Sequence, residues 1–206
     1  FRRRDPRVAE PPCGTALFAL TLAPAKERKG LHLALAAWRG FAAAHPEWHW
    51  VLVGQEHREE PYGRELAADL ARAPRIRRVE RIDEATKQAW LRRARVHLFT
   101  PVEAADGAPE GFGLTCLEAA ACGTPTVATT SCGAAEHLGR ELGEFVASEE
   151  DALRAALERV AALDPAGRAR FAREAAHAVG AHDLRRSAAR VLEVLELSPA
   201  RGAART

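Results

Sequence analysis

Residues Val96 to Thr130 read VHLFTPVEAADGAPEGFGLTCLEAAACGTPTVATT, and this stretch decides the fold. It begins with a short apolar run, Val96 to Thr100, and ends with another, Thr126 to Thr129. Between them, the alanine-rich segment from Gly113 to Ala121 has the composition of a helix. Two short apolar runs joined through a helix are typical of a βαβ unit, whose strands are parallel. We therefore expect a parallel sheet.

The same alternation of short apolar runs and helical patterns extends in both directions from this unit. Strands are expected at Leu17 to Leu22, Trp50 to Gly54, Ile76 to Val79, Val96 to Thr100, Thr126 to Thr129 and Phe145 to Ala147. Helices are expected at Gly30 to Ala44, Arg64 to Ala73, Glu84 to Arg93, Gly113 to Ala121, Ala134 to Leu138, Asp151 to Leu163 and Asp183 to Leu197. We predict an α/β fold with a doubly wound, Rossmann-like, six-stranded parallel sheet and helices on both faces.

Two loops would form a binding site if the strands follow the common doubly wound order 3-2-1-4-5-6. In that order the topological switch point lies between the first and fourth strands, and ligands bind outside their carboxyl ends. One of the two loops contains Lys26, Arg28 and Lys29. The other follows Thr100 and leads to Gly113.

The length and composition of the chain indicate one domain. With 206 residues, 47% of them hydrophobic, the chain can bury one substantial core and is short for two. Residues 1–12 are rich in arginine and proline and are interpreted as a linker or disordered segment. The domain is expected over residues 13–198, followed by a disordered tail at 199–206. Because the chain begins at Phe1 and contains no methionine, we interpret it as a piece of a longer protein.

The charge and the cysteine content of the chain indicate which classes of partner and which cellular location to expect. Lysine and arginine total 30 against 28 for aspartate and glutamate, so net charge does not indicate a nucleic-acid partner. No apolar run approaches the length of a membrane span. The four cysteines show neither C-x-x-C pairs for zinc nor a disulfide framework, which favours the cytoplasm. Because of the arginines between residues 72 and 95, a peripheral contact with an anionic membrane is an alternative.

The loop before the Gly113 helix is the most unusual segment of the chain. Gly111 and Gly113 flank Phe112 where the helix is expected to begin, so the backbone can turn tightly and a ligand can approach it. The first amides of that helix have no intrahelical acceptor and lie at the positive end of the helix dipole. We expect these amides to hold a phosphate.

Two glutamates flank this loop. Glu110 precedes the helix, and Glu118 lies about 7 to 8 Å along its axis from Gly113, at roughly 1.5 Å per residue. A helical side chain leans toward the N-terminus, so Glu118 can reach back toward a ligand at the helix end. Carboxylates repel phosphate and accept hydrogen bonds from hydroxyl groups. The loop therefore suits a ligand ordered as sugar, diphosphate and ribose.

Residues Pro109 to Leu138, PEGFGLTCLEAAACGTPTVATTSCGAAEHL, resemble the donor-binding signature of GT-B glycosyltransferases of the family 4 type, the glycosyl transferases group 1. The match consists of two glutamates separated by seven residues, an alanine-rich helix, and a Cys-Gly-Thr-Pro turn before a buried strand. It covers most of residues 15–147, and its further positions are Lys29-Gly30, Val53-Gly54, Gly133 and Glu136. The resemblance implies the C-terminal half of a GT-B fold.

The resemblance implies a nucleoside-diphosphate sugar as donor substrate, with no metal or other cofactor. It also implies a role for each matching position. Glu110 would bind hydroxyls of the donor sugar, and Lys29 would neutralise the departing diphosphate, so these two are the expected catalytic residues. Glu118 would bind the ribose hydroxyls. The remaining donor-binding residues would be Gly111, Phe112, Gly113, Leu114 and Thr115 around the diphosphate, with Arg81 and Ile82 beside the base.

The function that the resemblance implies is transfer of the sugar to an acceptor, with retention at the anomeric carbon. In the family, an N-terminal domain supplies the acceptor site and faces the donor domain across a cleft. We expect that domain to be missing from this chain. We therefore expect the isolated domain to bind the donor without transferring the sugar.

Two positions differ from the family pattern. Ala23 stands where members usually carry an arginine for the phosphates, and Glu80 stands in place of a glycine near the base. Lys26 or Arg28 would have to supply the missing charge. Because of these differences, one alternative function is a non-catalytic module that binds a nucleotide sugar or a partner protein. A GT-B-like epimerase is a further alternative. A nicotinamide dehydrogenase is disfavoured because the third glycine of the dinucleotide fingerprint is absent.

Overall fold

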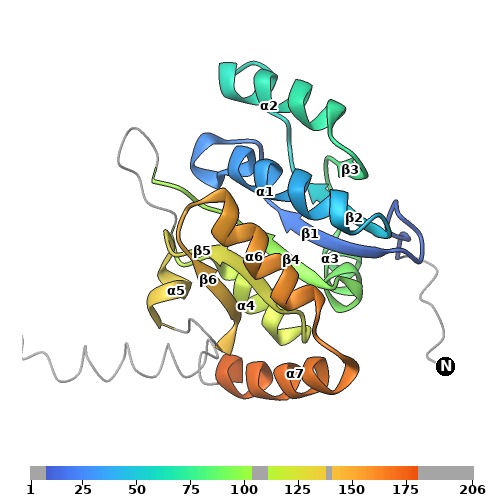
Figure 1. The fold of residues 1–206 in the computed structure, drawn as a ribbon, viewed down its shortest axis with the longest axis vertical. Coiled ribbons are helices and arrows are strands. Elements are labelled where there is room, and N and C mark those ends of the chain that lie inside the picture. The colour runs from blue at the N-terminus through green and yellow to red at the C-terminus, as the bar shows by residue number, and fades with distance from the viewer. Residues whose placement is uncertain (1–7, 104–110, 138–140, 181–206) are drawn as a thin grey trace, which may run out of the picture.

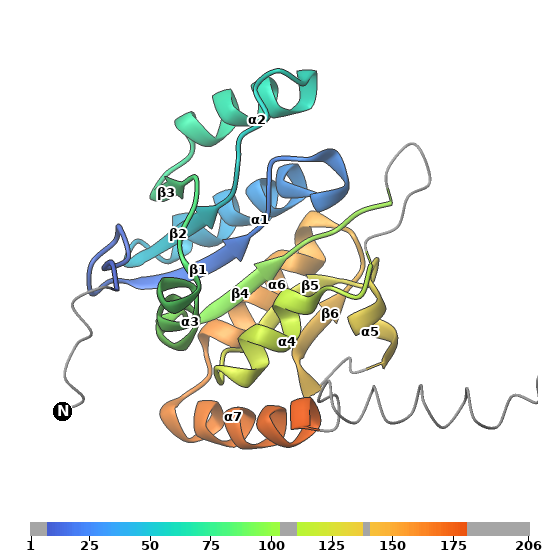
Figure 2. The same ribbon diagram turned by 180° about the vertical axis from the view of Figure 1, so that it is seen from behind.

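A six-stranded sheet forms the centre of the computed structural model, which describes residues 8–103, 111–137 and 141–180. The strand order is β3-β2-β1-β4-β5-β6, and all neighbouring strands are parallel (Figure 1 and Figure 2). The strands are β1 (Leu17–Leu22), β2 (Trp48–Val53), β3 (Ile76–Val79), β4 (Val96–Phe99), β5 (Thr126–Thr129) and β6 (Gly143–Val146). The predicted fold class and the strand order 3-2-1-4-5-6 are confirmed.

The inner strands are covered on both faces, which explains why they read as continuous apolar runs. Every residue of β4 and β5 is buried, whereas the edge strands β3 and β6 contain no fully buried residue along their described lengths. The one buried hydroxyl of β1, on Thr21, is satisfied twice. It donates to the Leu98 carbonyl at 2.7 Å and accepts from Trp50 Nε1 at 2.9 Å. This short chain of bonds links β2, β1 and β4.

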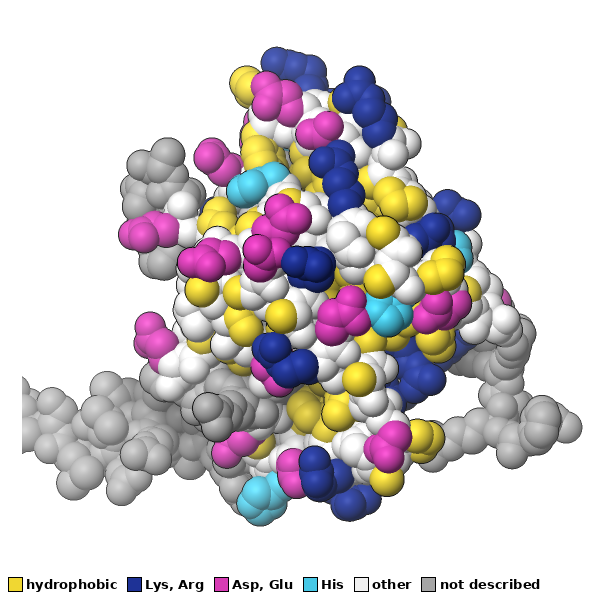
Figure 3. Space-filling model, viewed as in Figure 1, with side chains coloured by type: hydrophobic (Ala, Val, Ile, Leu, Met, Phe, Trp, Pro, Cys, Tyr) yellow, Lys and Arg dark blue, Asp and Glu magenta, His cyan; other side chains and the backbone are white. Residues whose placement is uncertain are grey.

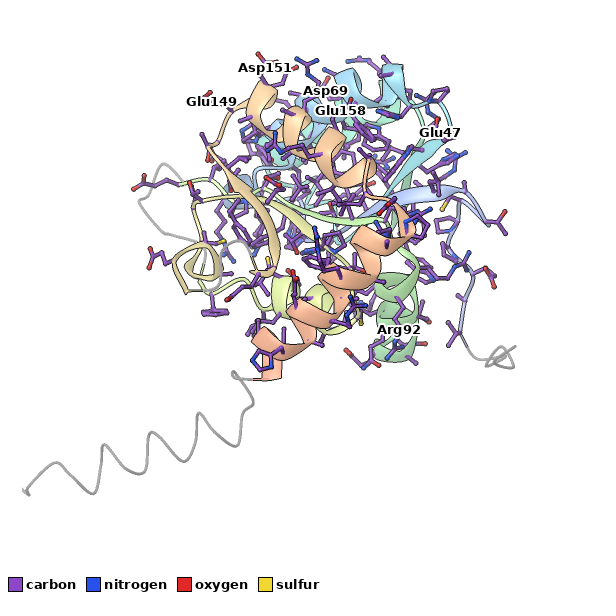
Figure 4. All side chains as sticks on the ribbon, turned by 60° about the horizontal axis from the view of Figure 1, so that its bottom comes forward. Glu47, Asp69, Arg92, Glu149, Asp151 and Glu158 are labelled. Atoms are coloured by element: carbon purple, nitrogen blue, oxygen red, sulfur yellow. The ribbon has the colours of Figure 1, made fainter. Side chains whose placement is uncertain are left out.

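Helices α1 (Leu31–Ala44), α2 (Pro61–Arg72) and α6 (Glu150–Ala161) cover one face of the sheet (Figure 1). The buried face of α1 includes Leu31, Trp38 and Phe41, at helical spacing, and both aromatic rings are fully buried. Beyond the end of α1, His45 Nε2 lies 2.6 Å from a carboxylate oxygen of Glu158, which extends from α6 (Figure 4). These contacts hold α1 and α6 side by side.

Helices α3 (Glu84–Arg93), α4 (Leu114–Ala121) and α7 (Pro165–Gly180) lie on the opposite face, with the short α5 (Gly133–His137) beside β6 (Figure 2). The Asp83 carboxylate accepts from the Thr86 amide at 2.7 Å, which fixes the start of α3. On β4, the fully buried His97 ring stacks on Phe99, and burial lowers the pKa of His97 to about 3. His97 is therefore a neutral packing residue at physiological pH.

Several element boundaries differ from the predicted ones. β2 begins at Trp48, two residues before the predicted start, because Trp48 is buried with the rest of the strand. α2 begins at Pro61 and not at Arg64, since proline is well suited to the first helical position. β6 begins at Gly143, two residues early. The other strands and helices lie within one or two residues of their predictions.

Helix α7 was not predicted, and its sequence explains why. Within this fully described helix, Ala175 alone is buried, so no stripe of large apolar residues marks its inner face. The helix predicted at Asp183 to Leu197 lies outside the described residues. Among the described helices, none has both the length and the apolar character needed to cross a membrane.

The N-terminal residues that the structure describes lie against α3. Trp90 Nε1 donates to the Ala9 carbonyl at 2.7 Å, and an Arg93 side-chain nitrogen lies 2.8 Å from the Gly14 carbonyl oxygen. Residues 1–7 and 199–206 lie outside the described residues, so the boundaries of the predicted linker, domain and tail stay predictions.

The face covered by α1 and α6 carries charges of both signs. Figure 3 shows lysine and arginine side chains interspersed with aspartate and glutamate side chains across this face. Arg154 of α6, for example, lies 2.6 Å from Asp151 on the same helix. Such a mixed surface produces no extended field of one sign on this side of the described domain.

Candidate functional site

The two loops at the topological switch point lie directly against each other. The Thr100 hydroxyl donates to the Gly30 carbonyl at 3.0 Å, and the Val102 amide donates to the Arg28 carbonyl at 3.0 Å. Gly30 has a φ of 58°, and a Cβ atom there would lie 1.8 Å from the Thr100 carbonyl oxygen. Only glycine fits this close approach. The loop that carries Lys29 is therefore fixed beside the carboxyl end of β4.

The ring of Phe99, the last residue of β4, contacts both predicted phosphate-binding elements. Lys29 Nζ lies 5.9 Å from the ring centroid, a cation–π distance. Gly113 approaches the same ring so closely that a Cβ atom at this position would lie 3.0 Å from Phe99 Cε1. The fold thus brings Lys29 and the start of α4 to one aromatic side chain.

The glycine loop is held by the first amides of α5. The Gly133 amide donates to the Gly111 carbonyl at 3.1 Å, and the Ala134 amide donates to the Phe112 carbonyl at 2.8 Å. Helices begin with amides that lack intrahelical acceptors, and here the loop satisfies two of them. These bonds fix the approach of the chain to α4.

The N-terminus of α4 has the features of an anion site. Gly113 is its N-cap residue, with φ 82° and ψ 52°, and it has no side chain to cap the helix. Its carbonyl accepts from the Cys116 amide at 2.9 Å, so the amides of Leu114 and Thr115 precede the first intrahelical bond. Leu114 is 67% exposed, so the described residues leave the helix end uncovered. A phosphate is the ligand that such a helix end favours.

Glu118, one turn further along α4, is paired with a residue that the sequence analysis did not identify. Its Oε1 lies 2.7 Å from Nζ of Lys87 on α3, and the same ammonium lies 2.9 Å from Glu84. Burial alone would lower the pKa of Lys87, but its hydrogen bonds to Glu118 and Glu84 outweigh burial and raise this pKa. Lys87 is therefore charged, and it orients the Glu118 carboxylate.

A cleft of about 410 Å³ lies at the carboxyl ends of β1, β2 and β3, within the size range of small-molecule sites. Arg81 and Ile82, the residues predicted beside the base, line this cleft together with Glu80. Lys87 also lines it, so the ion pair places Glu118 next to the cleft. A second hollow of about 520 Å³ adjoins it and shares Gly54, Gln55 and Glu80.

The position that departs from the family pattern, Ala23, is 4% exposed and lines the same cleft. Its carbonyl oxygen lies so close to Gly54 that a Cβ atom on that glycine would be 2.0 Å away. The neighbouring cations Lys26 and Arg28 are half-buried beside this turn. The methyl group of Ala23 supplies no charge to a ligand in the cleft.

Glu110 lies outside the described residues, so its predicted position at the loop is not tested. Of the other predicted site residues, Lys29, Phe112, Gly113, Leu114 and Thr115 gather around Phe99 and α4. Arg81 and Ile82 lie in the cleft, and Gly111 has open space where a Cβ atom would be placed. The described site is thus one continuous edge that runs from the Lys29 loop to the end of β3.

Among the described residues, one group has an arrangement that could hold a metal ion. It consists of His57, Glu59 and Glu60, whose ligand atoms lie within 4.8 Å of one another. His57 Nδ1 already lies 3.0 Å from a Glu59 carboxylate oxygen, and both glutamates are exposed. His57 and Glu59 line the second hollow, which adjoins the cleft, and the group belongs to none of the elements that form the predicted phosphate site.

The chain is similar to known proteins in sequence and in fold. At 29% identity over 169 residues, the chain is similar to "Putative colanic acid biosynthesis glycosyltransferase WcaL" of Escherichia coli K12; the aligned region is 78% of this chain and 39% of that protein. Among solved structures, it is similar to an Escherichia coli structure described as trehalose-6-phosphate bound with UDP-2-fluoro glucose. The TM-score is 0.73 at 15% identity, over 89% of this chain and 44% of the other. The UDP-forming trehalose-phosphate synthase of Burkholderia vietnamiensis gives a TM-score of 0.73 at 18% identity, with 89% and 46% covered.

These solved structures establish the fold, a Rossmann-like half of the GT-B architecture, and the chain spans less than half the length of each of these relatives. The sequence pattern of the family described as "Glycosyl transferases group 1" matches residues 15–163, well over half of the chain. The match includes β1 to β6 and every described residue of the predicted site. The chain belongs to the glycosyl transferases group 1 family.

Proposed function

We propose that this domain binds a nucleoside-diphosphate sugar and forms the donor-binding half of a glycosyltransferase. The observation that carries the proposal is that a cation, the start of a helix and an acid lie along one edge of the sheet. A cation, Lys29, lies over the Phe99 ring, which also contacts the start of α4. An acid, Glu118, follows on the same helix beside the cleft. Each group suits a different part of such a donor.

The ligand would lie along this edge in a defined order. The diphosphate would contact the amides of Leu114 and Thr115, with Lys29 close by. The ribose hydroxyls would donate to Glu118, whose carboxylate Lys87 orients. The base would occupy the 410 Å³ cleft. The sugar would extend toward Glu110, a role inferred from the family resemblance alone.

In the proposed reaction, the bond between the anomeric carbon and the diphosphate oxygen breaks, and the electron pair leaves with that oxygen. Negative charge therefore grows on the diphosphate as the sugar departs. The Lys29 ammonium and the α4 amides would lie where this charge develops, and preorganised groups of this kind stabilise a transition state. The acceptor hydroxyl oxygen forms the new bond to the anomeric carbon, and its proton passes to the departing diphosphate oxygen. In this scheme the charge on the leaving group is stabilised without a metal, and retention follows from the family resemblance.

The acceptor site would belong to another part of the full-length protein, since this chain spans 39% of the bacterial relative and 44% of the trehalose-related structure. We propose that the 206-residue chain alone binds the donor and does not transfer the sugar. Its proposed location is the cytoplasm.

Calorimetric titration of this chain with a panel of nucleoside diphosphates tests the proposal. At least one member of the panel is expected to bind, and Glu118→Ala is expected to weaken its affinity about tenfold or more, as for loss of a hydrogen bond to a charged group. Glu65→Ala is a matched control, because Glu65 is an exposed helical glutamate on α2, away from the site. If no nucleoside diphosphate binds at millimolar concentration, the proposal is wrong.

A second candidate function is a module that binds a nucleotide sugar without catalysis. The observation in its favour is Ala23, which supplies no charge at the position where family members usually carry an arginine. Both functions predict nucleotide binding by this chain. A sugar-transfer assay on the full-length protein separates them, since only the enzyme forms a glycosylated acceptor.

A further inference from the structure

Glu80 is an unpaired acid in the proposed base cleft. It directly follows β3, whose last residue, Val79, accepts from the Gly54 amide at 3.0 Å, so the backbone before it is fixed. Its neighbour across the adjoining hollow, Glu56, lies 2.6 Å from Arg78 and is thereby neutralised. Within the part of the chain that the structure describes, the Glu80 carboxylate has no hydrogen bond or ion pair, and it is exposed to the cleft. Its oxygens are available to accept hydrogen bonds from a ligand.

The next two residues complete a set of groups suited to a nucleobase. Arg81 supplies hydrogen-bond donors and Ile82 an apolar surface, and both line the same cleft as Glu80. Lys87 lines the cleft from α3 and is bonded to Glu118, the proposed ribose ligand. A base in the cleft would therefore lie beside the ribose position, with the acid and the guanidinium next to its edge.

The chemistry of Glu80 discriminates among the common bases. A carboxylate accepts hydrogen bonds and donates none. Guanine presents two adjacent donors, its N1–H and its 2-amino group, which match the two oxygens of one carboxylate. Uracil and thymine present a single N–H between two carbonyl acceptors, and adenine and cytosine present an amino group beside a ring-nitrogen acceptor. Guanine also carries the O6 and N7 acceptors that arginine commonly binds.

We propose that this cleft selects guanine, with Glu80 as the specificity-determining residue and Arg81 as its companion, so that the donor is a guanosine-diphosphate sugar. This inference rests on the proposed function. Glu80 acts as a hydrogen-bond acceptor toward N1–H and the 2-amino group, and Arg81 donates to the opposite part of the same edge. Glycine at position 80 would offer neither acceptor.

Calorimetric titration of the 206-residue chain with GDP, IDP, UDP and ADP tests the inference. GDP is expected to bind about tenfold more tightly than UDP and ADP, and more tightly than IDP, because hypoxanthine lacks the 2-amino group. In Glu80→Gln, where one acceptor oxygen becomes a donor, the preference for GDP is expected to fall to about threefold or less. Glu65→Gln on α2 should keep the wild-type preference.

The possible outcomes distinguish failure of the guanine assignment from failure of the proposed function on which it rests. Binding of UDP or ADP as tightly as GDP would overturn the inference and leave the proposed function intact. A preference for GDP that persists in Glu80→Gln would overturn the assignment to Glu80. Failure of all four diphosphates to bind would overturn the proposed function as well. The comparison of GDP with IDP needs no variant, so it decides the role of the 2-amino group even if a substitution lowers the stability of the chain.

Discussion

At the scale of single residues, the pair formed by Lys87 and Glu118 gives the proposed ribose site its charge and its geometry. The two side chains come from different helices and meet at 2.7 Å, with exposed fractions of 21% and 39%. A partly exposed pair of this kind contributes at most about 1 kcal/mol to folding. Its main effect is local, because Lys87 orients the Glu118 carboxylate and offsets its repulsion of a nearby diphosphate.

Lys87→Met is therefore expected to weaken nucleoside-diphosphate binding about threefold to tenfold, while the free energy of unfolding falls by less than about 1 kcal/mol. Methionine keeps the apolar stem of the side chain and removes the charge. Calorimetry measures the affinity, and urea denaturation measures the stability. Arg92→Met on the same helix (Figure 4) is the matched control and should leave the affinity unchanged. Equal or tighter binding by Lys87→Met would contradict this role.

The Lys87 pair also shows why part of the site could not be predicted from the sequence. The predicted residues Lys29, Gly113 and Glu118 belong to a recognisable motif or follow a predicted strand. Lys87 lies 31 positions before its partner, in a helix whose orientation relative to α4 depends on tertiary packing. Phe99 was predicted as part of a strand, and its contacts with Lys29 and Gly113 depend on the same packing.

At the scale of elements, the two glycines of the loop have different tasks. Both were expected to provide tight turning and close approach. Gly113 does so, with φ 82° and the Phe99 ring against it. Gly111 has no positive φ and has open space around its missing Cβ. The start of α4 therefore depends on Gly113 for its conformation, whereas glycine at position 111 is not required by the described fold.

Gly113→Ala is expected to reduce the free energy of unfolding by about 1 to 3 kcal/mol, because a left-handed conformation and a close contact both oppose a methyl group. Gly111→Ala is its matched control within the same loop and should change this energy by less than about 0.5 kcal/mol. Urea denaturation of the two variants measures both effects. Equal losses in the two variants, or none in Gly113→Ala, would show that the conformation of Gly113 does not set the start of α4.

Sequence patterns predicted the elements well where large apolar residues mark a strand or one face of a helix, and poorly where they do not. The inner strands are buried along most of their length, and their apolar runs located them to within two residues. Helix α7 packs against α4 mainly through small or half-buried residues, so its pattern carried little signal. The switch point was predictable because parallel sheets place their ligand-binding loops at the carboxyl ends of the strands.

At the scale of the whole molecule, the edge proposed to bind the donor is formed by loops that meet at the middle of the sheet. The carboxyl ends of β1 and β4 point to the same side, and the described residues that directly follow each strand lie on that side (Figure 2). Covering helices on both faces keep these strands rigid, and rigid support is what fixed charges at a reaction centre require. Catalysis by the full-length protein would combine this edge with an acceptor site located elsewhere.

In the proposed binding mode, the amides at the start of α4 bind the diphosphate of the donor. The most direct measurement is a titration of the isotope-labelled chain with a nucleoside diphosphate, followed by NMR signals of the backbone amides. We predict that the amides of Gly113, Leu114 and Thr115 show the largest shifts and saturate together with the calorimetric binding curve. Saturable binding with shifts confined to other surfaces, such as the hollow lined by Arg173 and His177 on α7, would contradict the account.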